Sequence, residues 1–436
     1  MPESFVIVGL GPAGFAAALT LKKNRADFEI TAIDEKGFDL LHSCSLPSAI
    51  EGNIPLEHLA ENMGLEKMGI KVIREKAVSI DLKKKIIATD KGKEVKFSKL
   101  LISTGAKPKV PPIKGLKELL GKKTFLFHSH GDAKLLGNAL SKAKNIAVIG
   151  GGAIGVELSY ALNEKGFKVR LIQMDPTLLP KAIDADISDA LAEHLRKEGI
   201  EVLLSTTAKE FSEKEILTDK GSFAYDLAVV AVGVSPNLEI VKGTAIETTP
   251  CGIKIDGLLR TNMDGIYAAG DVAESRDFIT KKSCAINLAS PAYQQGIILA
   301  NNLSGKNSEY RGTLNTFAIT IGNFELASTG LTGKSAQENN LEPVSVTVKG
   351  KTHYNWHPDA KDLAIKLVAS REGKLLGAQA YGSGAAARID VVSTAIFAGF
   401  SLNDFSMIEL AYQPDIRQAH DLLLTAAELL QNRLRR

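Results

Sequence analysis

The stretch LHSCSLP, residues 41–47, places a single cysteine, Cys44, shortly after the first glycine-rich segment of the chain. A thiolate is a nucleophile that forms and breaks disulfides, and redox cysteines usually occur as closely spaced pairs. No second cysteine lies near Cys44 in sequence, because the other two are Cys251 and Cys284. Cys44 is therefore either a small buried apolar residue, as most free cysteines are, or a thiol whose partner sulfur arrives from outside the chain.

Three glycines near the N-terminus have the spacing of a phosphate-binding turn. The segment GLGPAG contains Gly9, Gly11 and Gly14, which follow an expected strand over 4–8 and precede an expected helix over 15–23. The first glycine permits a tight turn, the second lets backbone N–H groups approach a pyrophosphate, and the third allows close packing of helix and strand. This segment predicts a dinucleotide site.

An acidic side chain completes the pattern. The expected strand over 28–33 is followed by Asp34 and Glu35, about 20 residues beyond Gly14, where a carboxylate binds a ribose hydroxyl. Asp34 is the preferred candidate and Glu35 is the alternative.

The same unit occurs a second time. A strand over 145–149, the turn GGGAIG with Gly150, Gly152 and Gly155, a helix and a strand over 168–172 repeat the arrangement. Two complete units make an accidental pair of glycine-rich loops improbable, so two dinucleotides are predicted.

The second unit leaves the nature of its dinucleotide open. Gln173 stands where a ribose-binding acid is expected, followed by Met174 and Asp175. No arginine is there to bind a 2′-phosphate, so the sequence does not decide between NADH and NADPH.

Composition favours small ligands. Lys plus Arg (53) nearly balances Asp plus Glu (50) and no basic block is present, so we expect neither a nucleic acid nor a membrane as partner. Three cysteines in 436 residues fit a reducing compartment, which predicts a cytoplasmic protein without structural disulfides.

The apolar run over 5–21 is interrupted by glycines, as a strand followed by a turn and a helix would be. We interpret it as neither a signal nor a membrane segment. We assign no metal site.

Further strands and helices are expected along the chain. Pro108, Pro111 and Pro112 mark a crossing between domains, and Asp271 follows a strand over 265–269. Other elements are expected in these ranges: strands over 84–89, 99–103, 228–232, 344–348 and 363–368, and helices over 289–303, 388–398 and 420–436. From about residue 316 the pattern predicts a strand-rich α+β unit.

Six motifs carry a family resemblance over nearly the whole chain. GLGPAG, STGAKP, GGGAIGVE, AVGVSPN, IYAAGDV and AYQPD, in this order, resemble the FAD-dependent pyridine nucleotide-disulfide oxidoreductases. HSCSLPSAIEG resembles the single-cysteine branch of that family, which includes coenzyme A disulfide reductases, persulfide and polysulfide reductases, NADH oxidases and NADH peroxidases. Cys44, Leu46 and Pro47 match its typical stretch, whereas Ser45 and Ser48 depart from it.

The resemblance implies an α/β architecture with two Rossmann-like dinucleotide-binding domains and a C-terminal α+β dimerisation domain. Residues 1–112 and 237–315 would form the FAD-binding domain, 113–236 the NAD(P)-binding domain and 316–436 the dimerisation domain. The chain is accordingly expected to form a homodimer, with FAD and either NADH or NADPH as cofactors.

The resemblance also implies roles for individual residues. Asp271 would lie near the ribityl chain of FAD, Glu157 beside the nicotinamide, and Tyr412 of one subunit near the flavin and Cys44 of the other. The expected cofactor-binding residues are Gly9, Gly11, Gly14, Asp34, Glu35, Thr104, Gly105, Gly150, Gly152, Gly155, Glu157, Gly270 and Asp271. Cys44 and Tyr412 are the expected catalytic residues.

Departures from the family narrow the substrate. Water-forming oxidases and peroxidases are similar but carry a histidine where this chain has Pro12, which argues against oxygen or peroxide as the main substrate. Coenzyme A disulfide reductases carry a tyrosine pair where this chain has Trp356 and His357, and their Tyr-x-Pro-Pro reads YQPD at 412–415. The thiol pocket is thus expected to be rebuilt.

We therefore predict an enzyme that reduces a low-molecular-weight disulfide, persulfide or polysulfide with NAD(P)H, through FAD and Cys44. A helix starting in LPSAI is expected to lower the pKa of the Cys44 thiol. Two alternatives stay open, namely an NAD(P)H oxidase and a flavin-bearing electron-transfer or redox-sensing protein. Tyr412 either donates a proton or packs at the interface, and the roles of His357 and His420 are not decided.

Overall fold

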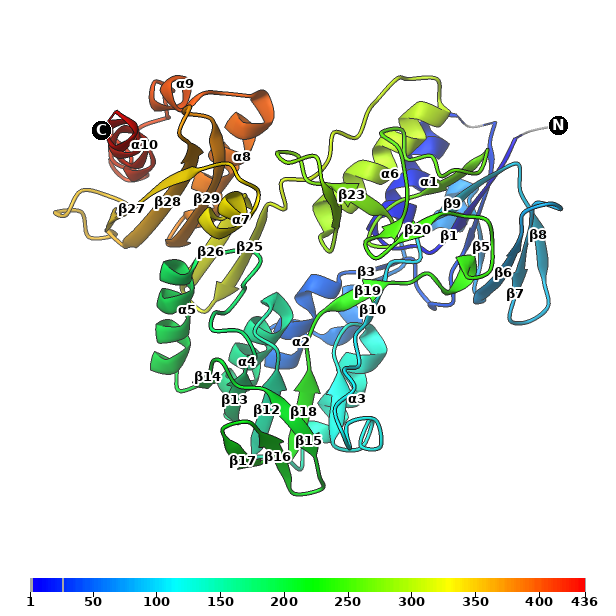
Figure 1. The fold of residues 1–436 in the computed structure, drawn as a ribbon. Coiled ribbons are helices and arrows are strands. Elements are labelled where there is room, and N and C mark those ends of the chain that lie inside the picture. Colours follow the sequence, from blue (N-terminus) through cyan, green and yellow to red (C-terminus); the bar gives the residue numbers. More distant parts are fainter. Residues whose placement is uncertain (1–2, 26, 436) are drawn as a thin grey trace.

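The computed structural model describes residues 3–25 and 27–435 and folds into three units, each built on a five-stranded sheet (Figure 1). We call them the first unit, the second unit and the C-terminal unit. The first two have parallel sheets and the third an antiparallel one. The predicted α/β class with a C-terminal α+β unit is confirmed.

The sheet of the first unit has its N-terminal strand at the centre. Its strands, in spatial order, are β22 (Ile266–Ala268), β9 (Lys99–Ile102), β1 (Ser4–Val8), β2 (Glu29–Ile33) and β5 (Lys71–Ile73). Successive side chains of β1 point to opposite faces. Phe5 and Ile7 pack with helices α1 (Pro12–Asn24) and α6 (Ala289–Leu303), whereas Val6 and Val8 pack on the other side. Both faces of the sheet are therefore buried, as its apolar strands require.

The opposite face is covered by a three-stranded antiparallel meander. Its strands are β6 (Ala77–Asp81), β7 (Ile86–Thr89) and β8 (Glu94–Lys96). Ile80 and Ile87 of the meander belong to the same apolar cluster as Val6 and Val8.

Helices α1 and α6 lie in close contact because small residues face each other. A Cβ added to Gly296 would lie 2.2 Å from the backbone oxygen of Ala13. Only glycine fits there, so this position fixes how near α6 approaches the start of α1.

The second unit repeats the first. Its strands, in spatial order, are β11 (Thr124–Leu126), β18 (Leu227–Val230), β12 (Asn145–Ile149), β13 (Lys168–Ile172) and β14 (Glu201–Leu203). Three helices accompany this sheet, α3 (His130–Leu140), α4 (Ala153–Glu164) and α5 (Ala185–Lys197), together with a meander of β15 (Ala208–Phe211), β16 (Glu215–Thr218) and β17 (Gly221–Ala224).

The chain crosses between these two units twice, side by side. β10 (Ala106–Pro108) pairs antiparallel with β19 (Val234–Pro236), and the first sheet is then completed by β22. The predicted proline-marked crossing lies at β10.

The C-terminal unit carries an antiparallel sheet and four helices among the described residues. The strands, in spatial order, are β25 (Phe317–Ile321), β26 (Phe324–Gly330), β29 (Leu375–Gly382), β28 (Asp362–Ser370) and β27 (Pro343–Lys351). The helices are α7 (Gly333–Glu338), α8 (Ala385–Ala398), α9 (Leu402–Ser406) and α10 (Leu422–Leu434). The helix predicted over 420–436 is thus α10, and residue 436 lies outside the described part. None of the described helices combines the length and apolar character needed to span a bilayer.

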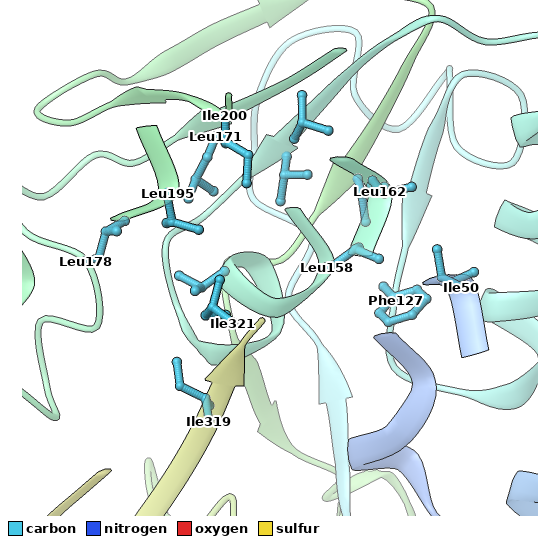
Figure 2. Packing of buried hydrophobic residues seen from close by; sticks show 14 of the residues in the cluster. Ile50, Phe127, Leu158, Leu162, Leu171, Leu178, Leu195, Ile200, Ile319 and Ile321 are labelled. Atoms are coloured by element: carbon cyan, nitrogen blue, oxygen red, sulfur yellow. The ribbon is translucent and has the colours of Figure 1, made fainter. Parts of the chain in front are cut away.

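One apolar cluster joins all three units (Figure 2). It contains Ile50 from α2 (Leu46–Glu51), Leu158 and Leu162 from α4, and Ile319 and Ile321 from β25. Each of these side chains is at most 5% exposed. Because these contacts come from distant parts of the sequence, the cluster fixes the units relative to one another.

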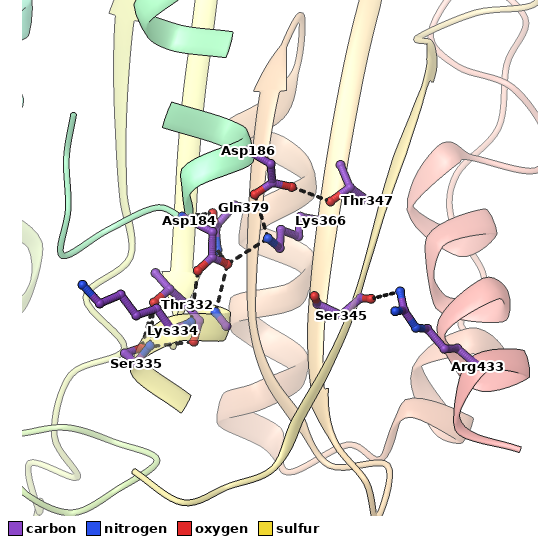
Figure 3. Close-up of polar contacts among 11 residues, drawn as sticks. Asp184, Asp186, Thr332, Lys334, Ser335, Ser345, Thr347, Lys366, Gln379 and Arg433 are labelled. Atoms are coloured by element: carbon purple, nitrogen blue, oxygen red, sulfur yellow. Dashed lines mark hydrogen bonds and ion pairs between the residues drawn. The ribbon is translucent and has the colours of Figure 1, made fainter. Parts of the chain in front are cut away.

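A polar network adds a second link between the second and C-terminal units (Figure 3). Asp184, just before α5, accepts hydrogen bonds from the backbone N–H of Gly333 (2.9 Å) and from the Gln379 amide (2.8 Å). Lys366 Nζ lies 3.1 Å from Asp184 and 2.7 Å from Asp186. Burial disfavours the charged form of Asp184, but these donors outweigh it and hold its pKa below the usual value.

We expect Asp184→Asn to lower the free energy of unfolding by about 3 kcal/mol, because the buried Lys366 then loses its buried carboxylate partner and keeps only the more exposed Asp186. The Asp184 and Lys366 side chains are only 10% and 11% exposed. Since the folded-state pKa is lowered, the advantage of the wild type should be complete above about pH 4 and vanish as pH falls through that pKa. Urea unfolding of both proteins at several pH values measures it.

The exposed Lys334–Glu338 pair on α7 supplies the control. Glu338→Gln should change the free energy of unfolding by less than about 0.5 kcal/mol. Equal effects of the two substitutions would contradict a stabilising role for the network.

Candidate active site

The first glycine turn is shaped by contacts that leave no room for side chains. Gly9 has φ +99°, and a Cβ there would lie 2.3 Å from the carbonyl oxygen of Ser103. A Cβ on Gly14 would lie 2.0 Å from the carbonyl oxygen of Gly9, so α1 packs directly on the turn. Gly11, in contrast, faces open space. No side chain caps α1 and its first turn carries no acid, so its N–H groups are available for a phosphate.

The second turn has the same construction. Gly150 has φ +111° and its added Cβ would lie 2.4 Å from the carbonyl oxygen of Ala231, while a Cβ on Gly155 would lie 1.9 Å from that of Gly150. Gly152 faces open space at the uncapped start of α4. Both turns therefore fit the pyrophosphate of a dinucleotide.

Asp34 lies against the first turn and Glu35 does not. The Asp34 carboxylate is buried and accepts hydrogen bonds from the backbone N–H of Leu10 (2.6 Å) and of Lys36 (2.9 Å). Glu35 is exposed. An ionised carboxylate has further acceptor sites, so Asp34 can still bind a ribose hydroxyl, which favours the preferred candidate.

Cys44 lies in a short 3₁₀ turn, Ser43–Ser45, directly before α2. The residue is exposed as a whole, yet protein around its sulfur disfavours the thiolate, and Glu157 and Asp271 repel it, so the pKa of the thiol is raised. The predicted lowering of this pKa is wrong. Helix α2 does begin at Leu46, but it has only six residues. Burial of the sulfur and, after it, repulsion by the two acids raise the pKa of the thiol instead.

Two carboxyl groups face this thiol from the two nucleotide-binding units. Burial raises the pKa of Glu157, on α4, and of Asp271, after β22, to about 7 in each case. Asp271 follows Gly270, which has φ +77° and donates its N–H to Gln295 Oε1 (2.7 Å). Near neutral pH each carboxyl is therefore available as a proton donor or as an acceptor.

The structure thus brings together Cys44, Glu157 and Asp271, which are widely separated in sequence. A thiol beside two carboxyls of raised pKa can exchange a proton as it changes redox state.

The described residues offer no site for a metal ion. In residues 3–25 and 27–435, no group of three or more His, Cys, Asp and Glu side chains could hold one.

Thr104 and Gly105 hold the crossing between the units. The Thr104 hydroxyl donates to the carbonyl oxygen of Asn237 (2.8 Å), and the Asn237 N–H donates to that of Gly105 (2.9 Å). These bonds join β10 to β19, and a cofactor contact at either residue remains a proposal.

Tyr412 lies in the C-terminal unit, half exposed. Partial desolvation and the neighbouring Tyr354 raise its pKa. Nearby, the buried His357 places Nε2 3.0 Å from Asp415 Oδ1 and accepts the Asp359 N–H at Nδ1 (3.1 Å), which assigns the proton to Nε2. His420 is exposed, with Nε2 3.4 Å from Glu428.

Sequence reasoning missed several of these partners. Tyr354 and Gln295 lie in no motif. Asp415 ends the AYQPD motif, but nothing in the sequence indicated its contact with His357. His353 stacks on His357 with ring centroids 4.6 Å apart. A glutamine on the buried face of the apolar helix α6 is a signal that points to Gln295, because a buried amide needs a hydrogen-bond partner.

A model of the pyridine nucleotide-disulphide oxidoreductases matches residues 3–296, and a model of their dimerisation domain matches residues 316–421. The chain belongs to this family. The match spans both nucleotide-binding units and the C-terminal unit, and the dimerisation domain supports a homodimer.

Similar proteins have related activities. An NADH oxidase of Methanocaldococcus jannaschii is 32% identical over 438 residues, covering 97% of this chain and 97% of its own. A CoA-dependent NAD(P)H sulfur oxidoreductase of Pyrococcus furiosus is 30% identical over 449 residues, which cover 98% of this chain and 99% of that protein. The structure of an NAD-dependent persulfide reductase from A. fulgidus superposes with a TM-score of 0.94 at 28% identity, covering 99% of this chain and 83% of that one.

The protein is accordingly an oxidoreductase that uses FAD and a nicotinamide nucleotide. The open positions at Gly11 and Gly152, the uncapped helices behind them and the anchored Asp34 carboxylate fit these two dinucleotides.

We expect Glu157→Gln to lower the pKa of the Cys44 thiol, because it removes one of the two carboxylates that repel the thiolate. In a Cys251→Ser, Cys284→Ser background, the pH at which iodoacetamide alkylation of Cys44 is half-maximal should fall. Glu164→Gln, at the far end of the same helix, is the matched control and should leave this pH unchanged. An unchanged profile in Glu157→Gln would show that the two groups do not interact.

Proposed function

We propose that the protein uses NAD(P)H to reduce a low-molecular-weight disulfide, persulfide or polysulfide through FAD and Cys44. The observation that carries this proposal is the position of Cys44, an exposed residue whose thiol lies where the first and second units meet, near Glu157 and Asp271. The two relatives that handle sulfur substrates support the same class of reaction.

Each unit would hold one nucleotide. The first turn and Asp34 would bind the pyrophosphate and a ribose of FAD, with Asp271 further along the cofactor, and the second turn would bind the nicotinamide nucleotide with Glu157 near its reactive end. FAD supplies the transfer of an electron pair from NAD(P)H to a disulfide bond.

Cys44 would carry the substrate sulfur. The Cys44 thiolate attacks one sulfur of the substrate, forms a mixed disulfide and releases the first thiol or sulfide. Two electrons then break the mixed disulfide, which releases the second thiol and restores Cys44. In sum, one disulfide, one NAD(P)H and one proton give two thiols and one NAD(P)⁺.

The raised thiol pKa has a consequence for the second step. In a disulfide the sulfur of lower thiol pKa leaves faster. Compared with an unperturbed cysteine, the raised pKa of Cys44 makes its thiolate a poorer leaving group and so favours release of the external thiolate. Glu157 and Asp271, with pKa values of about 7, would then supply or hold the proton that accompanies each change at the sulfur.

Cys44→Ser should lower the rate of disulfide or polysulfide reduction at least about 100-fold, because the hydroxyl cannot form the mixed disulfide. Flavin content and the rate of flavin reduction by NADH should stay near wild type, since the residues that hold both nucleotides are unchanged. Stopped-flow absorbance and thiol release with cystine, coenzyme A disulfide and inorganic polysulfide measure these quantities.

Cys284→Ser provides the matched control, because Cys284 lies in β24 (Ser283–Ala285) and is half-buried. It should retain wild-type turnover. Full activity in Cys44→Ser would exclude a redox role for this thiol.

An NAD(P)H oxidase is the second candidate, favoured by the similarity to the M. jannaschii protein. Pro12, at the first position of α1, cannot donate or accept a proton, which argues against it. Under the oxidase hypothesis, oxygen consumption would persist in Cys44→Ser.

An anaerobic titration separates the two candidates. Wild-type flavoprotein treated with cystine and desalted should consume two equivalents of NADH per subunit, one for FAD and one for the mixed disulfide, whereas Cys44→Ser should consume one. One equivalent in both proteins would favour the oxidase.

A further inference from the structure

Gln173, which stands where the ribose-binding acid is expected in the second unit, forms hydrogen bonds within the protein. Gln173, directly after β13, is buried and accepts a hydrogen bond at Oε1 from the backbone N–H of Gly151 (2.9 Å). The Asp34 carboxylate accepts the equivalent bond from Leu10 in the first turn. Gln173 therefore occupies the same place relative to its turn as Asp34 does.

The Gln173 amide differs from a carboxylate in what it can still offer. Nε2 donates to Asp175 Oδ2 (3.0 Å) and to the carbonyl oxygen of Thr177 (3.2 Å). Both of its N–H groups are used, so Gln173 cannot donate to a ribose, and one of the two lone pairs of its oxygen already accepts the bond from the turn. The amide instead joins the glycine turn to Asp175.

Asp175 is held in a well-defined loop. The backbone N–H of Ser205 donates to the carbonyl oxygen of Asp175 (3.0 Å), and the N–H of Leu179 donates to that of Gly151 (2.8 Å). Asp175 is half-buried, and over the described part of the chain no ion pair involves it and no hydrogen bond reaches its Oδ1. One carboxylate oxygen is thus anchored through Gln173, and the other can accept a bond from a ligand.

We infer that Asp175 binds the adenosine ribose of the nicotinamide nucleotide, with Gln173 as its positioning residue, and that the enzyme therefore selects NADH over NADPH. This inference rests on the proposed use of the second unit for that nucleotide. A carboxylate accepts a hydrogen bond from the 2′-hydroxyl of NADH but repels the 2′-phosphate of NADPH. Within residues 3–25 and 27–435, no basic side chain forms an ion pair with Asp175 that would offset this repulsion.

Binding of redox-inert fragments tests the inference without any sulfur substrate. Isothermal titration calorimetry of the oxidised flavoprotein should show that ADP-ribose binds at least about tenfold more tightly than 2′-phospho-ADP-ribose. Asp175→Asn keeps an oxygen for the Gln173 amide but removes the charge, so it should narrow this ratio to about threefold or less. Asp189→Asn, an exposed site on α5 with the same change of charge, should leave the ratio unchanged.

Two further measurements separate positioning from general damage. Gln173→Ala should weaken ADP-ribose binding more than 2′-phospho-ADP-ribose binding, whereas a loosened fold would weaken both by the same factor. Higher salt should narrow the wild-type ratio, because it screens the repulsion between Asp175 and the 2′-phosphate.

Equal affinities of the wild type for the two fragments would overturn the inference, as would an unchanged ratio in Asp175→Asn. A failure of the proposed function looks different. If no sulfur compound is reduced but ADP-ribose still binds selectively, the role of Asp175 stands and the assignment of the substrate falls.

Discussion

Apolar packing around α4 is the interaction on which the arrangement of the site depends. Leu158 and Leu162 of this helix share one buried cluster with Ile50 of α2 and Ile321 of β25. Each such side chain contributes about 1.5 to 3 kcal/mol through burial. Glu157 is adjacent to Leu158, and Cys44 directly precedes α2, so the same contacts that join the three units also place the carboxyl near the thiol.

The electrostatics of the site follow from this packing. Glu157 and Asp271 lack a cationic partner among the described residues, and burial therefore raises their pKa values to about 7. A more solvated pair would stay ionised at neutral pH and could not donate protons. The same environment raises the pKa of Cys44, because its thiolate would be a further negative charge in a poorly solvated region that already holds two carboxyl groups.

Local pattern was sufficient to predict the nucleotide-binding units. β1, β12, β13 and α6 have the predicted bounds, because their apolar runs and flanking glycines define both ends. The first helix starts at Pro12 rather than residue 15, since proline suits the first helical position. Only one strand of the first meander was predicted, the segment over 84–89 that contains β7. The rest of that meander, the second meander and helices α3 and α5 were not predicted, because their short or strongly polar segments depend on packing against the sheets.

Site residues that belong to a sequence motif could be predicted, whereas features that depend on contacts between distant segments could not. Asp34 follows from its spacing after the glycine turn, whereas the proximity of Glu157 to Cys44 arises from packing between units. The direction of the Cys44 pKa shift was wrong for the same reason, since the sequence shows the start of a helix but not the acids that fold against it. In the sequence, Gln173 indicates only that the usual ribose-binding acid is missing. Its connection to Asp175 becomes visible only in the hydrogen bond between the two side chains.

The order of strands in the first sheet bears on how the chain folds during synthesis. β22 pairs with β9, but the whole second sheet, from β11 to β18, lies between them in sequence. The second unit can form its sheet as soon as β18 has left the ribosome, while the first keeps an unpaired edge at β9 until β22 emerges. The unit that would hold FAD is thus the later of the two to be complete, and a nascent chain exposes the β9 edge throughout that interval.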